Sequence, residues 1–157
     1  MKVMRTIFTA GLLAGILDIT AAFILFGLRG VTPDRILQSV AAGLLGPGAF
    51  KGGAKTAALG AVLHFFIATG AAAVYVLASR RLDALVRHPV PLGLLYGIAV
   101  YLVMTFVVVP LSAATRRPFV LDGTAVIMVL IHMGCVGLPI ALVASRFSPP
   151  ETEARAA

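Results

Sequence analysis

Four long stretches without charge constrain the fold of this chain more than any other feature of its sequence. Asp18 is the one charged residue in the first stretch, and the other three contain no Asp, Glu, Lys or Arg. A helix needs roughly 20 apolar residues to cross about 30 Å of hydrocarbon, and each stretch is long enough. The sequence therefore predicts four transmembrane helices, at about residues 6–28, 56–79, 92–114 and 123–145.

The composition excludes a water-soluble enzyme. Of the 157 residues, 60% are hydrophobic and 12% are charged, and the mean hydropathy is +1.03. A soluble domain of this size could not cover so much apolar surface with so few charges. Strands of a β-barrel would alternate over roughly ten residues, whereas these stretches are continuously apolar. We therefore expect an all-α membrane protein, with its four helices in an up-down bundle that forms one domain over residues 1–147.

The longest connection, residues 29–55, predicts a fifth and shorter helix. Thr32 is suited to the N-cap, Pro33 to the first helical position and Asp34 to the first turn. Apolar side chains then share one face until Gly46. A helix at about 33–45 is too short to span a bilayer, so we expect an amphipathic helix that lies at the interface and covers the bundle. The alternative is a lid over a central site.

Membrane topology explains the charge of +7 better than nucleic acid does. The 13 Lys and Arg residues lie mainly between the apolar stretches, and no basic and aromatic nucleic-acid surface is evident, so the expected partner is the lipid bilayer. The densest basic connection is residues 79–88, and short basic loops stay in the cytoplasm. We therefore expect both termini in the cytoplasm. Residues 148–157 are polar and are expected to form a disordered tail.

Three ionisable residues lie inside the predicted spans: Asp18, His64 and His132. Counted from the nearest charged loop residue on one membrane surface, they lie 11, 9 and 10 residues deep, respectively. At 1.5 Å per residue the depth is about 14 to 17 Å, which is the bilayer midplane. The matching depths predict a ligand or proton site formed by these three side chains.

The chemistry of such a cluster leaves several alternatives open. An ionised Asp at the midplane costs at least about 2.5 kcal/mol, so Asp18 must be protonated, paired or hydrated, and a histidine could be its partner. One carboxylate and two imidazoles can relay protons, bind a cation or hold a transition metal. Two histidines at one depth, His64 and His132, also suit a non-covalent haem. The structural alternative is a buried polar group that only fixes helix register.

Glycine spacing predicts where helices pack closely. Gly11 and Gly15 in the first span, and Gly93 and Gly97 in the third, are each four residues apart. This spacing lets helix backbones approach one another. We expect these four glycines to pack helices within the bundle, and the alternative is that one pair joins two protomers.

Two prolines lie within predicted spans. Pro110 and Pro139 have no amide N–H, so each leaves the carbonyl four residues earlier without its helical partner. Those carbonyls belong to Phe106 and Cys135. Cys135 lies one turn from His132, so its carbonyl is a candidate for the same polar site.

Five segments spread over most of the chain resemble a group of small bacterial inner-membrane proteins with no assigned function. They are GILD at 15–18, RGVTPDRILQS at 29–39, LHFF at 63–66, RHPV at 87–90 and VPLS at 109–112. The resemblance implies a multi-pass protein of the bacterial inner membrane. It implies no substrate, cofactor or activity.

Three functions are compatible with these features. The first is a small transport or proton- and cation-handling protein built around Asp18, His64 and His132. The second is a structural or accessory subunit of a membrane complex, and the third is an electron carrier with a non-covalent haem or a metal on those residues. No Ser-His-Asp spacing or pair of catalytic carboxylates favours an enzyme. Four spans are few for a monomeric transporter, so we expect a homodimer or a membrane-complex partner.

Overall fold

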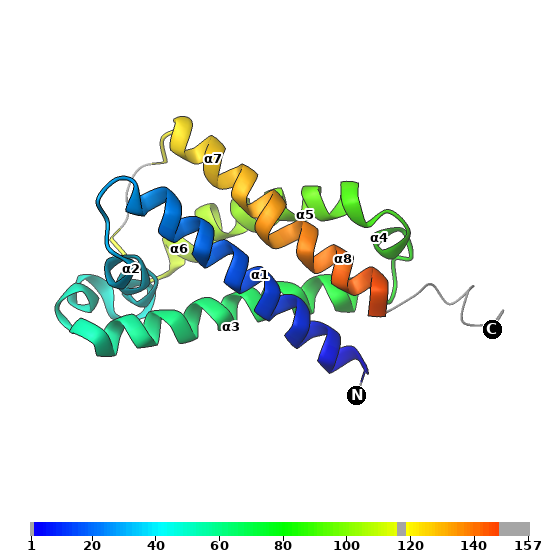
Figure 1. Cartoon of the computed structure of the whole chain (residues 1–157), viewed down its shortest axis with the longest axis horizontal. Coiled ribbons are helices and arrows are strands. Elements are labelled where there is room, and N and C mark those ends of the chain that lie inside the picture. The colour runs from blue at the N-terminus through cyan, green and yellow to red at the C-terminus, as the bar shows by residue number, and fades with distance from the viewer. Residues whose placement is uncertain (1, 116–118, 148–157) are drawn as a thin grey trace.

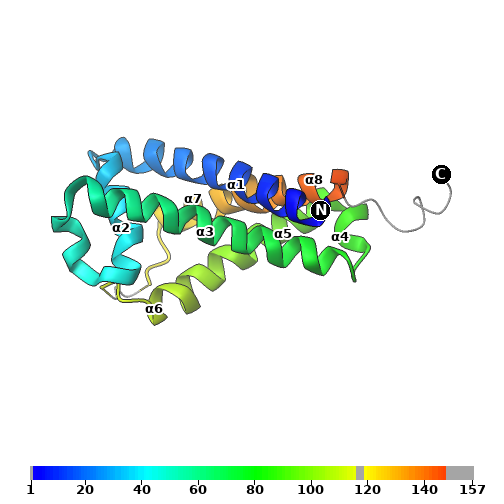
Figure 2. The same ribbon diagram turned by 90° about the horizontal axis from the view of Figure 1, so that it is seen from below.

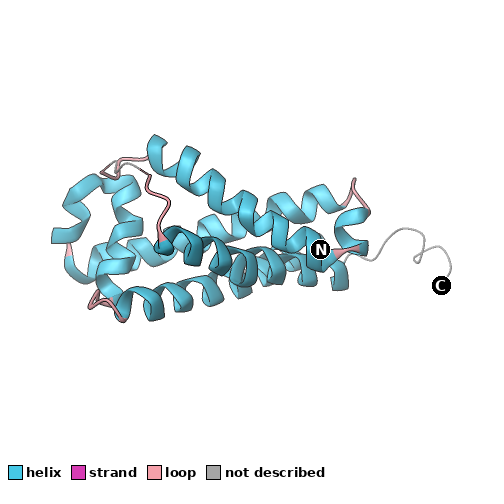
Figure 3. Cartoon of the chain, turned by 90° about the horizontal axis from the view of Figure 1, so that it is seen from above, coloured by secondary structure: helices cyan, strands magenta, loops and turns pink. Residues whose placement is uncertain are grey.

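Every regular element in the described part of the chain is a helix (Figure 3). The computed structural model describes residues 2–115 and 119–147. Four segments are long and apolar enough to cross a membrane: Lys2–Gly27, Gly53–Ser79, Pro89–Leu111 and Gly123–Phe147. The prediction of an all-helical chain with four candidate spans is confirmed, and every bound lies within four residues of the predicted one. The helices extend past the apolar stretches because charged residues at a helix end are compatible with helical backbone.

Two of the spans are single helices, and the other two are interrupted. α1 (Lys2–Gly27) and α3 (Gly53–Ser79) are continuous. The third span consists of α5 (Pro89–Val103), a π-helical segment η2 (Met104–Val108) and α6 (Val109–Leu111). The fourth consists of α7 (Gly123–Ile131), a second π-helical segment η3 (His132–Gly137) and α8 (Leu138–Phe147). Each π-helical segment comes shortly before a proline.

The spans run up and down along one elongated bundle (Figures 1 and 2). The start of α1, the end of α8 and the short helix α4 (Ala84–Arg87) lie together at one end of it. α1 packs against both α3 and α8, and α5 packs against η3 and α8. This arrangement leaves α1 and α8 antiparallel and adjacent.

The fifth helix, α2 (Pro33–Leu45), lies across the opposite end of the bundle (Figure 2). A 3-10 turn, Gly46–Lys51, follows it. α2 packs on α3 so closely that a Cβ atom on Gly60 would overlap the backbone of Leu37. The predicted helix is therefore present, with one side against α3, while its place at a membrane interface stays a prediction.

Thr32 does not cap α2 in the way that the sequence predicts. Its backbone has the extended conformation of an N-cap residue, but its side chain forms no capping hydrogen bond. The Thr32 hydroxyl is instead bonded to the side chain of Asp34, and this hydrogen bond lowers the pKa of Asp34 below its ordinary value. The start of α2 thus depends on the fixed φ of Pro33 more than on a cap.

Small residues form the centre of the bundle. Ala10 and Ala14 of α1, Ala72 of α3, and Ala141 and Ala144 of α8 are fully buried. Lipid chains are as apolar as the helices, so close van der Waals contact is what favours helix association in a membrane. The small side chains allow that contact and hold α1 between α3 and α8.

Candidate functional site

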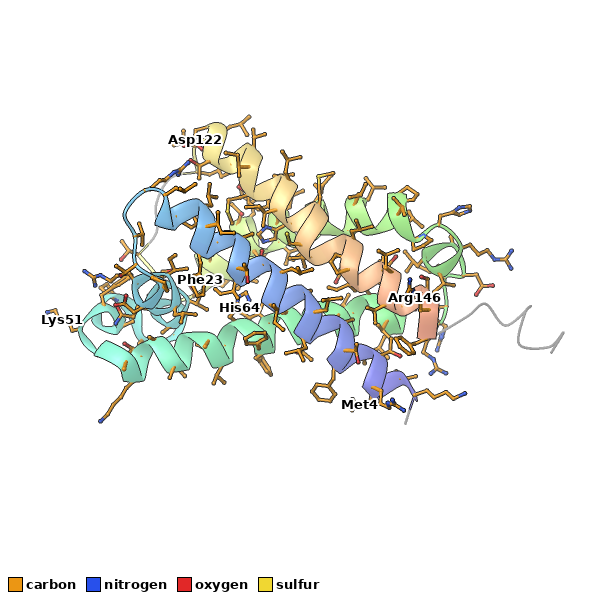
Figure 4. All side chains as sticks on the ribbon, viewed as in Figure 1. Met4, Phe23, Lys51, His64, Asp122 and Arg146 are labelled. Atoms are coloured by element: carbon orange, nitrogen blue, oxygen red, sulfur yellow. The ribbon has the colours of Figure 1, made fainter. Side chains whose placement is uncertain are left out.

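His64 joins α3 to α1 in the middle of the bundle (Figure 4). Its Nε2 atom lies 2.9 Å from the carbonyl oxygen of Gly15. Because a carbonyl oxygen can only accept, Nε2 must carry the proton, and Nδ1 has the lone pair when the ring is neutral. Gly15 has no room for a side chain, since a Cβ atom there would lie 2.7 Å from the ring of Phe65. The absence of a side chain at Gly15 therefore lets α3 approach α1 closely enough for this hydrogen bond.

His132 is the first residue of η3 and bonds to its own helix. Its Nδ1 atom lies 2.8 Å from the carbonyl oxygen of Met128. Nδ1 is therefore the protonated nitrogen, and Nε2 has the lone pair when the ring is neutral. The ring also lies edge-on to Tyr101 of α5, with 5.4 Å between the ring centroids. Both histidines thus use one nitrogen on a backbone carbonyl and keep the other as a possible proton acceptor.

Asp18 is half-buried, and one of its carboxylate oxygens has no hydrogen-bond partner. Oδ1 is shielded from solvent, and no donor reaches it among the described residues. The carboxylate lies near enough to the Cys135 thiol for the two groups to interact electrostatically. The histidine partner predicted for Asp18 does not bond to this oxygen, because His64 and His132 are directed to backbone carbonyls. Asp18 is therefore the member of the predicted cluster that still lacks a partner.

The π-helical segment η3, which packs against α1, has a wider backbone than the rest of the fourth span. The amide N–H of Leu138 bonds to the carbonyl of Met133, five residues earlier. Pro139 has no N–H to offer to Gly134 in this register or to Cys135 in the α-helical register. The sequence predicted the effect on Cys135 alone. In the π register the residue that faces the proline is Gly134 in place of Cys135, and the signal for the disturbance is the proline.

The same arrangement recurs in the third span. The amide N–H of Val109 bonds to the carbonyl of Met104, again five residues earlier, and Pro110 follows. The sequence predicted an α-helix in which the Phe106 carbonyl lacks its N–H partner. The structure has a π turn at this place instead. A π turn accommodates a proline because the wider backbone makes room for the ring that would otherwise press on the preceding turn.

The glycines of the third span bring α5 onto the fourth span beside His132. A Cβ atom on Gly97 would meet the backbone of His132 and Met133, and one on Gly93 would lie 2.8 Å from the Cβ atom of Ala141. In the first span, a Cβ atom on Gly11 would lie 2.6 Å from the Cα atom of Thr69. Both predicted glycine pairs therefore contact another helix of the same chain.

The structure places Asp18, His64 and His132 on three adjoining segments, α1, α3 and η3, and α1 packs against both others. Within residues 2–115 and 119–147, no three His, Cys, Asp or Glu side chains are grouped so that they could hold a metal ion. Haem binding stays a prediction. The arrangement can accept a proton or a small cation at Asp18, on a helix that packs against η3.

Comparison with known proteins found no family model that matches the sequence, no matching curated protein and no matching solved structure.

Proposed function

We propose that this protein binds and moves protons or small cations within the membrane, with Asp18 as the binding group. The observation that carries the proposal is the buried Oδ1 oxygen without a hydrogen-bond donor. A buried polar atom without a partner costs free energy, and for an ionised group the cost is larger. A proton or a cation on the carboxylate removes that cost. Intramembrane carboxylates commonly serve such pathways.

The fourth span supports this proposal independently. Broken or widened helices at the midplane of transporters expose carbonyl oxygens that coordinate ions. Here the fourth span has the wider π register just before Pro139, which has no amide N–H to donate, and Cys135 is near enough to Asp18 for the two groups to interact electrostatically. A protonated Asp18 can donate to such a carbonyl, and an ionised Asp18 can share a cation with it. The free ring nitrogens of His64 and His132 are the next proton acceptors.

The test is ion flux into vesicles that contain the purified protein. A pH-sensitive dye inside the vesicles reports proton entry, and exchange of the external cation tests sodium and potassium. Asp18→Asn removes the charge and the site for a proton but keeps the side-chain volume. We expect it to reduce flux at least about tenfold, because the group that holds the ion is gone.

Asp122→Asn is the matched control for this change. Asp122 accepts a hydrogen bond from the Ala125 amide at the start of α7, at 2.9 Å, and asparagine caps helices equally well. The control should keep the flux of the unmodified protein. A folded Asp18→Asn protein with unchanged flux would refute the proposal, and so would the absence of proton or cation flux in the unmodified protein.

His64→Gln tests the relay. Glutamine retains an N–H that can reach the Gly15 carbonyl, so the α1–α3 contact is preserved while the titratable nitrogen is removed. We expect slower proton flux but unchanged cation binding. Equal proton flux in this variant would exclude His64 from the pathway without affecting the assignment of Asp18.

We also propose that the protein lies in a bacterial inner membrane with both termini in the cytoplasm. The four candidate spans return the chain to its starting side, and the basic loop at 79–88 lies on that side. A reporter that is active only in the periplasm should be inactive when fused after residue 157 and active when inserted after Gly48, in the 3-10 turn. The opposite pattern would reverse the orientation.

A further inference from the structure

A basic pocket lies at the end of the bundle where α1 begins and α8 ends (Figure 4, near Met4 and Arg146). Its volume is about 350 Å³, and its lining residues are Lys2, Arg5, Thr6, Thr9, Arg146 and Phe147. Among the residues that the structure describes, the lining has three cationic side chains, two hydroxyls and no acid. An uncompensated group of like charges favours an anion.

No counter-ion for these three cations is found within residues 2–115 and 119–147. No hydrogen bond or ion pair joins the charged groups of Lys2, Arg5 or Arg146 to another residue of the described ranges, whereas at the same end Arg87 lies 3.9 Å from Asp83. The N-terminus of α1 and the C-terminus of α8 meet at this end, so their helix dipoles oppose one another and the positive charge of the pocket comes from the side chains. Three cationic side chains from the two helices therefore converge on one pocket.

An apolar groove continues from the basic pocket along the same two helices. A second cavity, of about 360 Å³, lies between α1 and α8 and is lined by Leu13, Leu17, Leu138, Pro139, Leu142, Val143 and Arg146. Arg146 lines both cavities. On α1 the two linings form one stripe, because residues 2, 6, 9, 13 and 17 recur every three or four positions. The charged pocket and the apolar cavity are thus consecutive parts of one groove on the surface of the bundle, which we call the α1–α8 groove.

We propose that this α1–α8 groove binds one anionic phospholipid, with its phosphate in the basic pocket and an acyl chain along the apolar part. A free phosphate would use the first cavity only, whereas a lipid accounts for both and for their order. Basic pockets between transmembrane helices on the cytoplasmic side are known sites for anionic headgroups. The predicted orientation places this end of the bundle on that side.

The test is native mass spectrometry of the purified full chain, titrated with phosphatidylglycerol and, separately, with phosphatidylethanolamine. We expect one bound phosphatidylglycerol per chain and much weaker binding of the zwitterionic lipid. The double variant Arg5→Gln/Arg146→Gln should weaken phosphatidylglycerol binding about 25-fold, from about fivefold per arginine. Arg80→Gln/Arg81→Gln is the matched control, because it removes the same charge at the same end but outside the pocket. Equal losses in the two double variants would overturn the proposal.

Two further experiments distinguish the lipid from a free anion and from the chain's own C-terminal residues as the occupant of the groove. Leu142→Trp fills the apolar part of the groove and should by itself weaken lipid binding. If the affinity for the lipid is unchanged and inorganic phosphate displaces the lipid, the pocket is a simple anion site. That result would overturn the proposal. The residues after Phe147 include Glu151 and Glu153. If phosphatidylglycerol binds only after Glu151→Gln/Glu153→Gln, the occupant is the chain's own terminus, and the proposal is wrong.

Discussion

A methyl group at Gly97 should destabilise the bundle strongly. An Ala Cβ atom there would meet the carbonyl of His132 and the Cα atom of Met133, both backbone atoms that cannot rotate away. Overpacking of this kind costs typically 1–3 kcal/mol, and the upper end applies because backbone must move, at about 3 kcal/mol. Alanine recovers about 1 kcal/mol through its helix propensity. The expected net loss for Gly97→Ala is therefore about 2 kcal/mol.

Gly70→Ala is the matched control, since nothing lies within 4 Å of a Cβ atom built on that glycine. Propensity alone then acts, and this variant should be more stable by up to about 1 kcal/mol. The assay is thermal unfolding of the two variants in the same detergent. A loss of about 2 kcal/mol lowers the Tm by about 4 to 8 °C for a chain of this length. If Gly97→Ala melts with or above Gly70→Ala, the close α5–η3 contact is wrong.

Three further predictions follow from single contacts. Tyr75→Phe removes a buried hydroxyl that donates to the Leu85 carbonyl at 2.9 Å, so denaturant titration should show a loss of about 1 kcal/mol. Thr32→Val removes the hydrogen bond that lowers the pKa of Asp34, so an NMR titration should find a higher pKa for Asp34 in the variant. In the unmodified protein this bond stabilises the fold fully at pH values above the ordinary pKa of Asp34. The stabilisation is lost as the pH falls through the lowered pKa. Pro139→Ala restores an amide N–H, which allows η3 to return to α-helical register; the variant should melt at a higher temperature and carry less ion flux, and unchanged flux would separate the π turn from function.

Hydropathy located the four spans closely because the free energy of placing a segment in a membrane is a sum over its own residues. Asp18 could be recognised as costly for the same reason: the penalty depends on its depth, which residue counting supplies. The ends of α2 were equally local, because Pro33 and Gly46 act on their own turn of backbone. None of these inferences needed to know which helix lies beside which.

The partner of His64 was decided by the tertiary structure alone. His64 lies 49 residues from the carbonyl that it contacts, and the sequence offered Asp18 as an equally reasonable partner. Pro139 indicated a disturbed helix, but the π register and the packing of η3 against α5 are visible only in the structure. The α1–α8 groove likewise exists only because the first and last helices are adjacent and antiparallel. Insertion into a membrane is a property of one segment, whereas a site is formed by atoms from several segments, and their separation is set by packing.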